Sequence, residues 1–333
     1  MTSIAFTTTI PQEYIWPTSH VPLDLNNYFI TNPDPMKFID SGERKGMPRN
    51  TCSWIKGLLG VLDDLAERIS VIIAVTEGDC SNNHALINMY QYYYPHIDII
   101  RFSYPSDKNP EKLKMELDKL GSYFGVSYDK AMHTKKILDQ LRSKINKFDL
   151  LQNEKNTLSA KTVQQLLVST TDFNGDYNLF NSQVDAHIQK LQGQQAITDK
   201  IKIGYTGVPT IYNDLFDYVE NTFPIKVAYF EVEQDFSMHW LKHDLIQQYL
   251  AFQYPYDLFN RIQTINMEIE RRSLKAIIHY VQSFCHRQID AALIQKLIKV
   301  PVLLLEGDTP GPLDMRTKIR IESFMERLQD ENR

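Results

Sequence analysis

Cysteine is scarce in this sequence. Only Cys52, Cys80 and Cys285 occur among 333 residues, and none of them belongs to a close Cys-x-x-Cys pair. A small and odd number of cysteines argues against a framework of disulfide bonds. The missing close pairs also argue against a structural zinc site, which usually takes four ligands with short spacings.

An excess of positive charge and long apolar runs are absent too. The chain carries 36 basic and 41 acidic residues, so its net charge of −5 gives no electrostatic reason to expect nucleic acid or an anionic membrane as a partner. The longest apolar runs, such as VPVLLL, are too short to span a bilayer. The first residues, MTSIAFTTTIPQEY, contain neither a basic region nor a long apolar stretch, so we expect no signal peptide. These features predict a cytoplasmic protein.

Short apolar segments alternate with helical ones in the C-terminal part of the chain. We expect strands at Lys200–Gly207, Ile225–Val232, Ala276–Val281 and Pro301–Asp308. Helices are expected around Thr210–Asn221, His239–Phe252, Tyr256–Lys275, from Arg287, and at Leu313–Asp330. Apolar strands separated by helices are typical of a parallel sheet that is buried on both faces and joined by right-handed crossovers.

The N-terminal part shows the same alternation less clearly. Strands are expected at Ser3–Thr9, within Val71–Cys80 together with the loop that follows, and at His96–Phe102. Helices are expected from IPQEY and over Thr51–Glu67. The stretch from about residue 110 to 197 is polar and helical, without a strand signal. We therefore predict an α/β protein with two doubly wound, Rossmann-like parallel-sheet domains. Residues 1–125 would form the first, 126–198 a helical connector, and 199–333 the second.

All three cysteines are expected where a helix begins, at the edge where strands end. Cys80 follows the strand VIIAV, Cys285 follows AIIHYV, and Cys52 opens the helix that runs through Trp54. Helix dipoles and unpaired N–H groups lower the pKa of a thiol there, and the thiolate is the form that binds metals. Packing is the usual role of a single cysteine, but three in one kind of position favour a shared role. Three soft thiolates suit an iron–sulfur cluster with one iron left open.

Histidines give weaker signals. His239 and His243 are spaced to share one helix face, but the glutamate of an HExxH zinc motif is missing, so a surface or packed pair is favoured. His84 and His286 lie near two of the cysteines and would be able to bond a cluster sulfur or relay a proton. Ordinary polar positions at helix starts are the favoured interpretation of both.

The segment Tyr205–Thr210 contains a glycine turn but no nucleotide-binding motif.

Several segments resemble one known family. The segment FCHRQIDAALIQKLIKVPVLLLEGDTPGPLDMRTKIRIESFMERL closely resembles the C-terminal end of the 2-hydroxyacyl-CoA dehydratase and benzoyl-CoA reductase family, the D-component family. FTTTIPQEYIWPTSHVPLDL resembles the start of its members, where a small polar residue precedes PEE and a helix. TCSWIKGLLG and EGDC resemble the surroundings of the first two cluster cysteines. The resemblance is strongest from about Ala276 to Leu328 and weakest in the helical middle.

The resemblance implies a dimeric, oxygen-sensitive enzyme with an iron–sulfur cluster on Cys52, Cys80 and Cys285. The partner would be a second copy or a related subunit, and an ATP-hydrolysing iron–sulfur activator would supply low-potential electrons. In the family's dehydratases, an open iron of a 4Fe–4S cluster binds the thioester carbonyl of a 2-hydroxyacyl-CoA, and a radical then expels the 2-hydroxyl group. In the related double-cubane cluster proteins, each chain holds half of a cluster shared across a dimer, and small molecules are reduced. A non-catalytic electron carrier or partner subunit is the alternative from another class.

The start of the chain departs from the family pattern. Thr8 stands for the small polar residue, and Gln12–Glu13 replaces the two acidic residues, so that Glu13 is the only carboxylate of the motif. We expect Thr8 and Glu13 to be catalytic groups that either face the substrate or support the residues that do, with helix capping as an equal alternative. The chain is also shorter than typical catalytic subunits. The PVLLLEGD and PQE segments nevertheless favour the dehydratase type over the double-cubane type.

Overall fold

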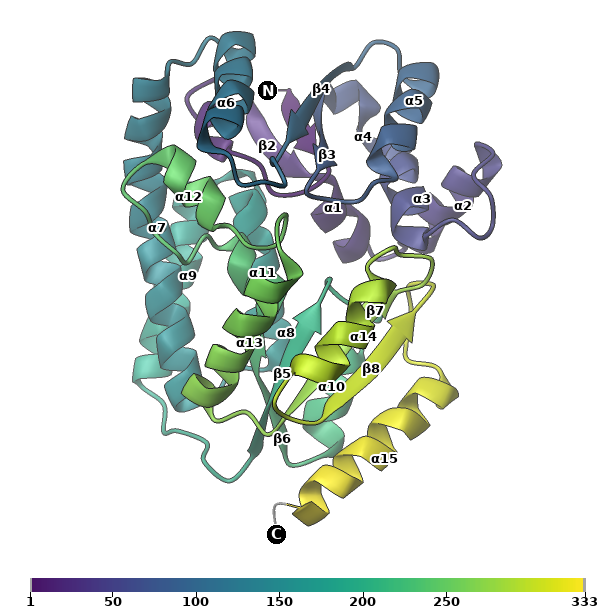
Figure 1. Cartoon of the computed structure of the whole chain (residues 1–333), viewed down its shortest axis with the longest axis vertical. Coiled ribbons are helices and arrows are strands. Elements are labelled where there is room, and N and C mark those ends of the chain that lie inside the picture. The colour runs from purple at the N-terminus through teal and green to yellow at the C-terminus, as the bar shows by residue number, and fades with distance from the viewer. Residues whose placement is uncertain (1, 332–333) are drawn as a thin grey trace. The chain divides into compact units, whose positions relative to one another are not determined.

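The computed structural model describes residues 2–331, and the chain divides into two compact units (Figure 1). Unit 1 comprises the chain up to Ile145, Ser169–Gln183 and Asp235–Asp257. Unit 2 comprises Asn146–Val168, Val184–Gln234 and the chain from Leu258 onward. Each unit thus combines segments that are distant in the sequence, and the helical region 126–198 contributes to both. The boundaries at residues 125 and 198 stay a prediction, because compactness does not show which segments fold independently.

Unit 1 is built around a four-stranded parallel sheet with the strand order β2-β1-β3-β4. Its strands are β1 (Ser3–Phe6), β2 (Val21–Asp24), β3 (Ile69–Glu77) and β4 (Asp98–Ser103). Three of these strands confirm the sequence pattern. The pattern misses β2, which is only four residues long, contains Pro22 and lies at the sheet edge, where a missing N–H group is tolerated.

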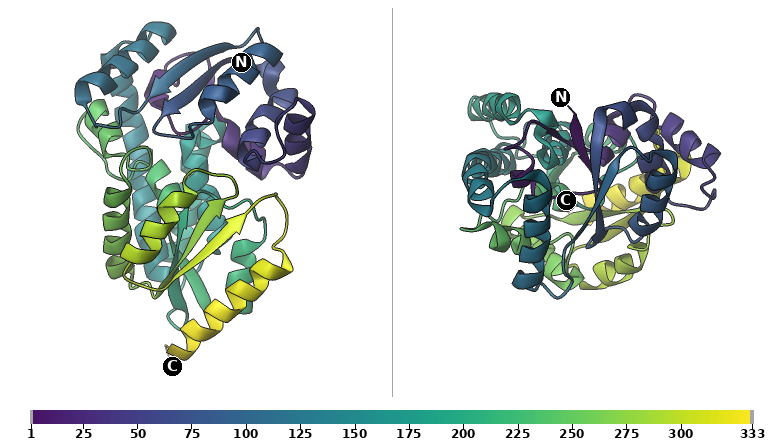
Figure 2. Two further views of the ribbon diagram at one scale, coloured as in Figure 1. Left: turned by 45° about the vertical axis from the view of Figure 1, so that its right-hand side comes forward. Right: turned by 90° about the horizontal axis from the view of Figure 1, so that it is seen from above.

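Helices flank the sheet of unit 1 (Figures 1 and 2). They are α1 (Leu25–Thr31), α2 (Met36–Arg44), α3 (Ser53–Gly60), α4 (Leu62–Leu65), α5 (Asn83–Tyr93), α6 (Pro110–Phe124) and α12 (Leu245–Ala251). Short 3-10 helices are η1 (Gln12–Tyr14), η2 (Ala66–Arg68), η3 (Ser169–Thr171) and η4 (Phe173–Gly175). Three helices contribute residues to both units: α7 (Tyr128–Lys155), α9 (Tyr177–Gln192) and α11 (Glu231–Phe236).

Unit 2 repeats the topology of unit 1, although no sequence repeat is visible. Its parallel strands lie in the order β6-β5-β7-β8. They are β5 (Ile201–Gly207), β6 (Ile225–Phe230), β7 (Ala276–Gln282) and β8 (Val302–Gly307). The flanking helices are α8 (Ala160–Val168), α10 (Leu215–Thr222), α13 (Leu258–Arg272), α14 (Gln288–Leu297) and α15 (Met315–Glu331). In the core, apolar side chains of α13 such as Ile265 pack against Ile277 of β7.

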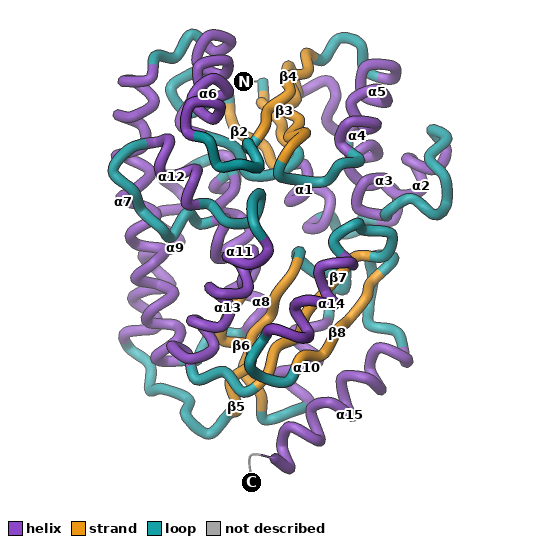
Figure 3. The backbone as a smooth tube through the Cα atoms, in the orientation of Figure 1, coloured by secondary structure: helices purple, strands orange, loops and turns teal. Residues whose placement is uncertain are grey.

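This strand order creates an equivalent position in each sheet (Figure 3). The chain passes from the first strand to one side and later returns to the other side, so the direction of winding reverses between β1 and β3 and between β5 and β7. Ligands of doubly wound proteins bind at such a switch point, beyond the carboxyl ends of the strands. The predicted α/β class with two all-parallel sheets is therefore confirmed, and the topology indicates where to look for a site.

Some helix predictions are wrong in detail. The segment IPQEY forms only the 3-10 turn η1, and the helix expected over Thr51–Glu67 consists of α3, α4 and η2. Helix α12 begins only after Asp244, whose carboxylate accepts a hydrogen bond from the Gln247 amide as the N-cap. His239 and His243 therefore precede the helix and do not share a helix face. Among the described helices, none has the length and apolar character needed to cross a membrane.

Candidate functional site

Cys80 lies at the switch point of the unit 1 sheet. It is the third residue after β3 ends, and its carbonyl oxygen accepts a hydrogen bond of 3.0 Å from the Asn83 amide at the start of α5. Gly78, with φ of +93°, makes the turn out of the strand. A Cβ atom at this position would lie 2.7 Å from Cβ of Pro255, so only glycine fits between the Cys80 loop and the segment 235–257.

Side chains from the start of α5 and from the segment 235–257 hold the Cys80 loop in place. The side-chain nitrogen Nδ2 of Asn83 donates to the Asp79 carboxylate over 3.0 Å and to the Val75 carbonyl oxygen over 2.8 Å. The Tyr254 hydroxyl donates to the other oxygen of Asp79 over 3.2 Å. Tyr254 belongs to the segment 235–257, which comes from far along the chain and folds onto unit 1. The backbone beside Cys80 is therefore fixed from both sides.

Cys285 has the same place in unit 2. It is the third residue after β7 ends, its amide donates to the Gln282 carbonyl over 3.1 Å, and its carbonyl accepts from the Gln288 amide over 3.1 Å. The preceding residue, Phe284, has a φ of +62°, which is uncommon for a residue with a side chain. The structure thus confirms that Cys80 and Cys285 lie in turns between a strand and a helix, at the carboxyl edges of the two sheets.

Cys52 is at a helix start, as predicted, but it does not follow a strand. It is the N-cap residue of α3 and only 5% exposed. The preceding element is helix α2, because the crossover from β2 to β3 contains additional helices. Gly60 allows α3 to approach the backbone of α2, since a Cβ atom there would clash with the Phe38 carbonyl oxygen. The Lys56 ammonium bonds the Arg49 carbonyl over 2.7 Å and so restrains the loop before Cys52.

The cysteines are divided between the units, with Cys52 and Cys80 in unit 1 and Cys285 in unit 2. All three are thiols that form no disulfide. Across residues 2–331, no group of three or more His, Cys, Asp or Glu side chains is arranged as a metal site. Three thiols are nonetheless a donor set that suits iron and sulfide rather than Mg²⁺ or Ca²⁺. Binding of one cluster by all three cysteines stays a prediction.

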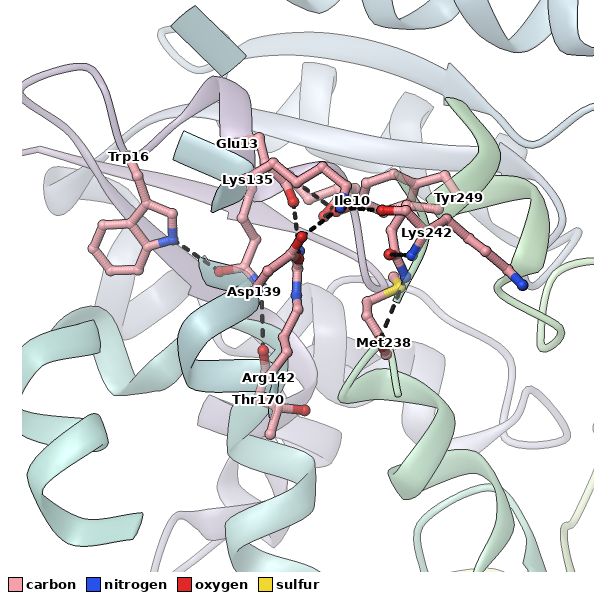
Figure 4. Close-up of polar contacts among 12 residues, drawn as sticks. Ile10, Glu13, Trp16, Lys135, Asp139, Arg142, Thr170, Met238, Lys242 and Tyr249 are labelled. Atoms are coloured by element: carbon pink, nitrogen blue, oxygen red, sulfur yellow. Dashed lines mark hydrogen bonds and ion pairs between the residues drawn. The ribbon is translucent and has the colours of Figure 1, made fainter. Parts of the chain in front are cut away.

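Glu13 is completely buried on η1 and has two strong partners (Figure 4). Its Oε1 lies 2.8 Å from Nη1 of Arg142, and its Oε2 accepts a hydrogen bond of 2.8 Å from the Tyr249 hydroxyl. Burial alone would lower the pKa of Arg142, but the charge of Glu13 raises it above its ordinary value. Burial, followed by the charge of Glu13, raises the pKa of Tyr249, which stays a donor. The N-cap of η1 is Pro11, so Glu13 does not cap this helix.

Further contacts extend this buried cluster along α7. Asp139 lies 3.1 Å from Nη1 of Arg142 and 2.5 Å from the Lys135 ammonium, which also bonds the Lys242 carbonyl over 2.7 Å. The Gln12 amide donates to the Thr170 carbonyl over 3.1 Å. Through these contacts, Gln12 and Glu13 attach the connection between β1 and η1 to α7, to η3 and to the segment 235–257. A catalytic role of Thr8, which is 6% exposed, and of Glu13 stays a prediction.

Sequence reasoning missed Arg142, Tyr249 and Tyr254. Arg142 lies on a polar helix and looks like a surface residue, whereas it is only 2% exposed. The two tyrosines lie in a stretch that the sequence assigns to the second domain. Of the two histidines near cysteines, His84 places Nε2 3.0 Å from the Thr76 carbonyl, and His286 is exposed. These contacts favour an ordinary structural role for His84.

The buried side chain of Glu233 in unit 2 leads us to expect that the stability of the folded chain depends on pH. Glu233 is fully buried, and its Oε2 has no hydrogen-bond partner among the described residues. Burial raises the pKa of Glu233 from its ordinary 4.5 to about 8. The folded chain thus holds a proton that the unfolded chain releases above pH 4.5, so this group's contribution to stability falls between pH 4.5 and 8.

Urea unfolding monitored between pH 5 and 8.5 tests this expectation. We expect Glu233→Gln to lose less stability with rising pH than the unmodified chain, by up to about 4 kcal/mol, because the amide does not ionise. The exposed Glu326→Gln is the matched control and should follow the unmodified chain. Parallel curves for the Glu233→Gln and unmodified chains would contradict a neutral Glu233.

Comparisons with known proteins identify a relationship over almost the whole chain. The family model described as 2-hydroxyglutaryl-CoA dehydratase, D-component, matches residues 7–328. A search of curated proteins finds no match. Among solved structures, the SBP FpvC from Pseudomonas aeruginosa in complex with Mn²⁺ is 10% identical, and the match covers 98% of this chain and 96% of that chain. Its TM-score of 0.20 is too low to indicate a shared fold.

Proposed function

This chain belongs to the 2-hydroxyglutaryl-CoA dehydratase D-component family, and we propose that it is the iron–sulfur subunit of a 2-hydroxyacyl-CoA dehydratase-like enzyme. In this proposal Cys52, Cys80 and Cys285 hold a 4Fe–4S cluster. The chain acts in a dimer, and an ATP-hydrolysing activator delivers electrons to it. The observation that carries the proposal is the equivalent position of Cys80 and Cys285 at the switch points of two sheets with the same topology.

The surroundings of these cysteines support a role in binding. Each lies just before a helix, where the N-terminal dipole favours the thiolate that iron requires. The loops around Cys80 and Cys285 are restrained by side chains and by backbone hydrogen bonds, so the thiols are positioned by the fold. A bound cluster would supply low-potential electrons and one open iron that polarises a carbonyl oxygen.

The carboxyl edge of the unit 1 sheet also has spare hydrogen-bonding capacity. Oγ1 of Thr9, after β1, and Oδ1 of Asn83, at the start of α5, are buried and have no hydrogen-bond partner among the described residues. Buried polar atoms of this kind are usually satisfied, and a bound polar molecule can satisfy them. We propose that Thr8, beside Thr9, faces the substrate, and that Glu13 supports this connection through Arg142 and Tyr249.

Anaerobic purification tests the proposal. We expect a brown protein with about four iron and four acid-labile sulfide per chain, as for a single cubane. With its partner subunit, the activator and ATP, it should convert a 2-hydroxyacyl-CoA to the unsaturated acyl-CoA and water. A chain that stays free of iron after anaerobic reconstitution would overturn the cluster. An iron-loaded chain that passes electrons to a partner without consuming any acyl-CoA would show a carrier instead.

A further inference from the structure

The end of β8 runs alongside the Cys285 loop. In the register of the sheet, Val281 lies opposite Glu306 and Gln282 lies opposite Gly307. Oε1 of Glu306 accepts a hydrogen bond of 2.7 Å from the Ser283 hydroxyl and one of 3.1 Å from the Gln288 side-chain amide. Ser283 precedes Cys285 and Gln288 follows it. A single carboxylate oxygen therefore connects the two ends of the loop that carries the cysteine.

Residues after Glu306 add backbone contacts. The Ser283 amide donates to the Gly307 carbonyl over 2.8 Å, and the Gln282 side-chain amide donates to the Asp308 carbonyl over 2.8 Å. A side chain at Gly307 would clash with the Tyr280 hydroxyl, which in turn donates to Gln282 Oε1 over 2.8 Å. Glu306, Gly307 and Asp308 at the end of β8 therefore all contact the last residue of β7 or the loop that follows it.

The loop between these contacts is strained. Phe284 has a φ of +62° and is 53% exposed, so neither a small side chain nor tight packing of the ring accounts for its left-handed backbone. Such conformations cost free energy and persist only where surrounding contacts enforce them. The contacts on either side of it are the backbone hydrogen bonds of Ser283 and Cys285 and the side-chain hydrogen bonds from Ser283 and Gln288 to Glu306. Without Glu306, the backbone at Phe284 and Cys285 is expected to relax.

We propose that Glu306 is a positioning residue for Cys285. Its carboxylate keeps the strained loop closed and thereby fixes where the Cys285 thiol lies at the sheet edge. The use of this thiol as an iron ligand rests on the proposed function, whereas the positioning itself is a property of the metal-free chain. The two can therefore be tested separately.

Thiol alkylation of the reduced, metal-free chain measures the positioning. Iodoacetamide labelling followed by peptide mass spectrometry gives separate rates for the three cysteines, so Cys52 and Cys80 serve as internal references. We expect Glu306→Ala to raise the rate at Cys285 several-fold, and by at most about tenfold, because Glu306 is exposed and water competes for its hydrogen bonds. Glu306→Gln retains an acceptor oxygen and should restore most of the protection. Ser283→Ala removes one of the two contacts and should give a smaller increase.

A glutamate elsewhere in unit 2 supplies the matched control. Glu322 on α15 accepts a hydrogen bond of 2.5 Å from the Tyr218 hydroxyl, and Glu322→Ala should leave the Cys285 rate unchanged. General unfolding would raise all three rates together, in which case Ser283→Ala becomes the deciding variant. A folded Glu306→Ala chain with an unchanged Cys285 rate would overturn the positioning role. A faster Cys285 rate in a chain that never binds iron would uphold positioning and reject the proposed function.

Discussion

Replacing Cys285 by alanine is expected to remove most of the iron from the anaerobically purified protein, and Cys52→Ala and Cys80→Ala should do the same. The reason is chelation: a cubane bound by three thiolates loses its attachment to one of the two units when Cys285 is absent. Only two thiolates in unit 1 would remain. Iron and acid-labile sulfide per folded chain, determined under argon for each variant, are the measurements.

Ser81→Ala is the matched control for the cysteine variants, because Ser81 is an exposed neighbour of Cys80 in the same loop. It should retain the iron of the unmodified chain. Circular dichroism of each variant separates loss of iron from loss of fold. Full retention of iron by Cys285→Ala would contradict the shared cluster, and loss restricted to the two unit 1 variants would place the metal in unit 1 alone.

The fold was predictable because apolar strands bounded by helices carry a strong local signal. β3 and β7 are mostly buried and rich in β-branched and apolar residues, and β8 contains the apolar run Val302–Leu305. Each of these strands, like β5, lies within a few residues of its predicted position. Strand β2 has no such signal, since it is only four residues long and contains Pro22. The helix predicted from His239 is an error of the opposite kind. The residues have helical spacing, but the helix begins only after its N-cap residue, Asp244.

The site was predictable only in its local part. The turn after a strand is a local feature, so the positions of Cys80 and Cys285 followed from the sequence. Contacts between residues that are far apart in the sequence could not be predicted, because no periodic pattern relates such residues. Arg142 is 129 residues from Glu13, and Tyr249 is 236 residues from it. The partition of Asp235–Asp257 into unit 1 is likewise tertiary information, and it brings Tyr254 to the loop of Cys80.

Replacing Arg142 by leucine is expected to lower the free energy of unfolding of the chain by about 3–5 kcal/mol, because a fully buried Glu13 would lose its cation. Glu13→Gln combined with Arg142→Leu should be much milder than Arg142→Leu alone, since no uncompensated carboxylate remains. Lys114→Leu breaks the exposed pair with Asp118 and is the matched control, with a cost of about 1 kcal/mol or less. Denaturant unfolding followed by circular dichroism measures all four chains.

The double variant also decides what Glu13 does. If Glu13 only fastens the first strand-to-helix connection to α7, a folded and iron-loaded double variant keeps most of its turnover. The Tyr249 hydroxyl would still have acceptors there, in the side-chain amide oxygen introduced by Glu13→Gln and in the Ile10 carbonyl 3.1 Å away. If the carboxylate takes part in the chemistry, the same protein loses turnover while its iron content and stability are preserved. An Arg142→Leu chain as stable as Lys114→Leu would instead show that the Glu13 pair is not a buried charge contact, and the support role would fail.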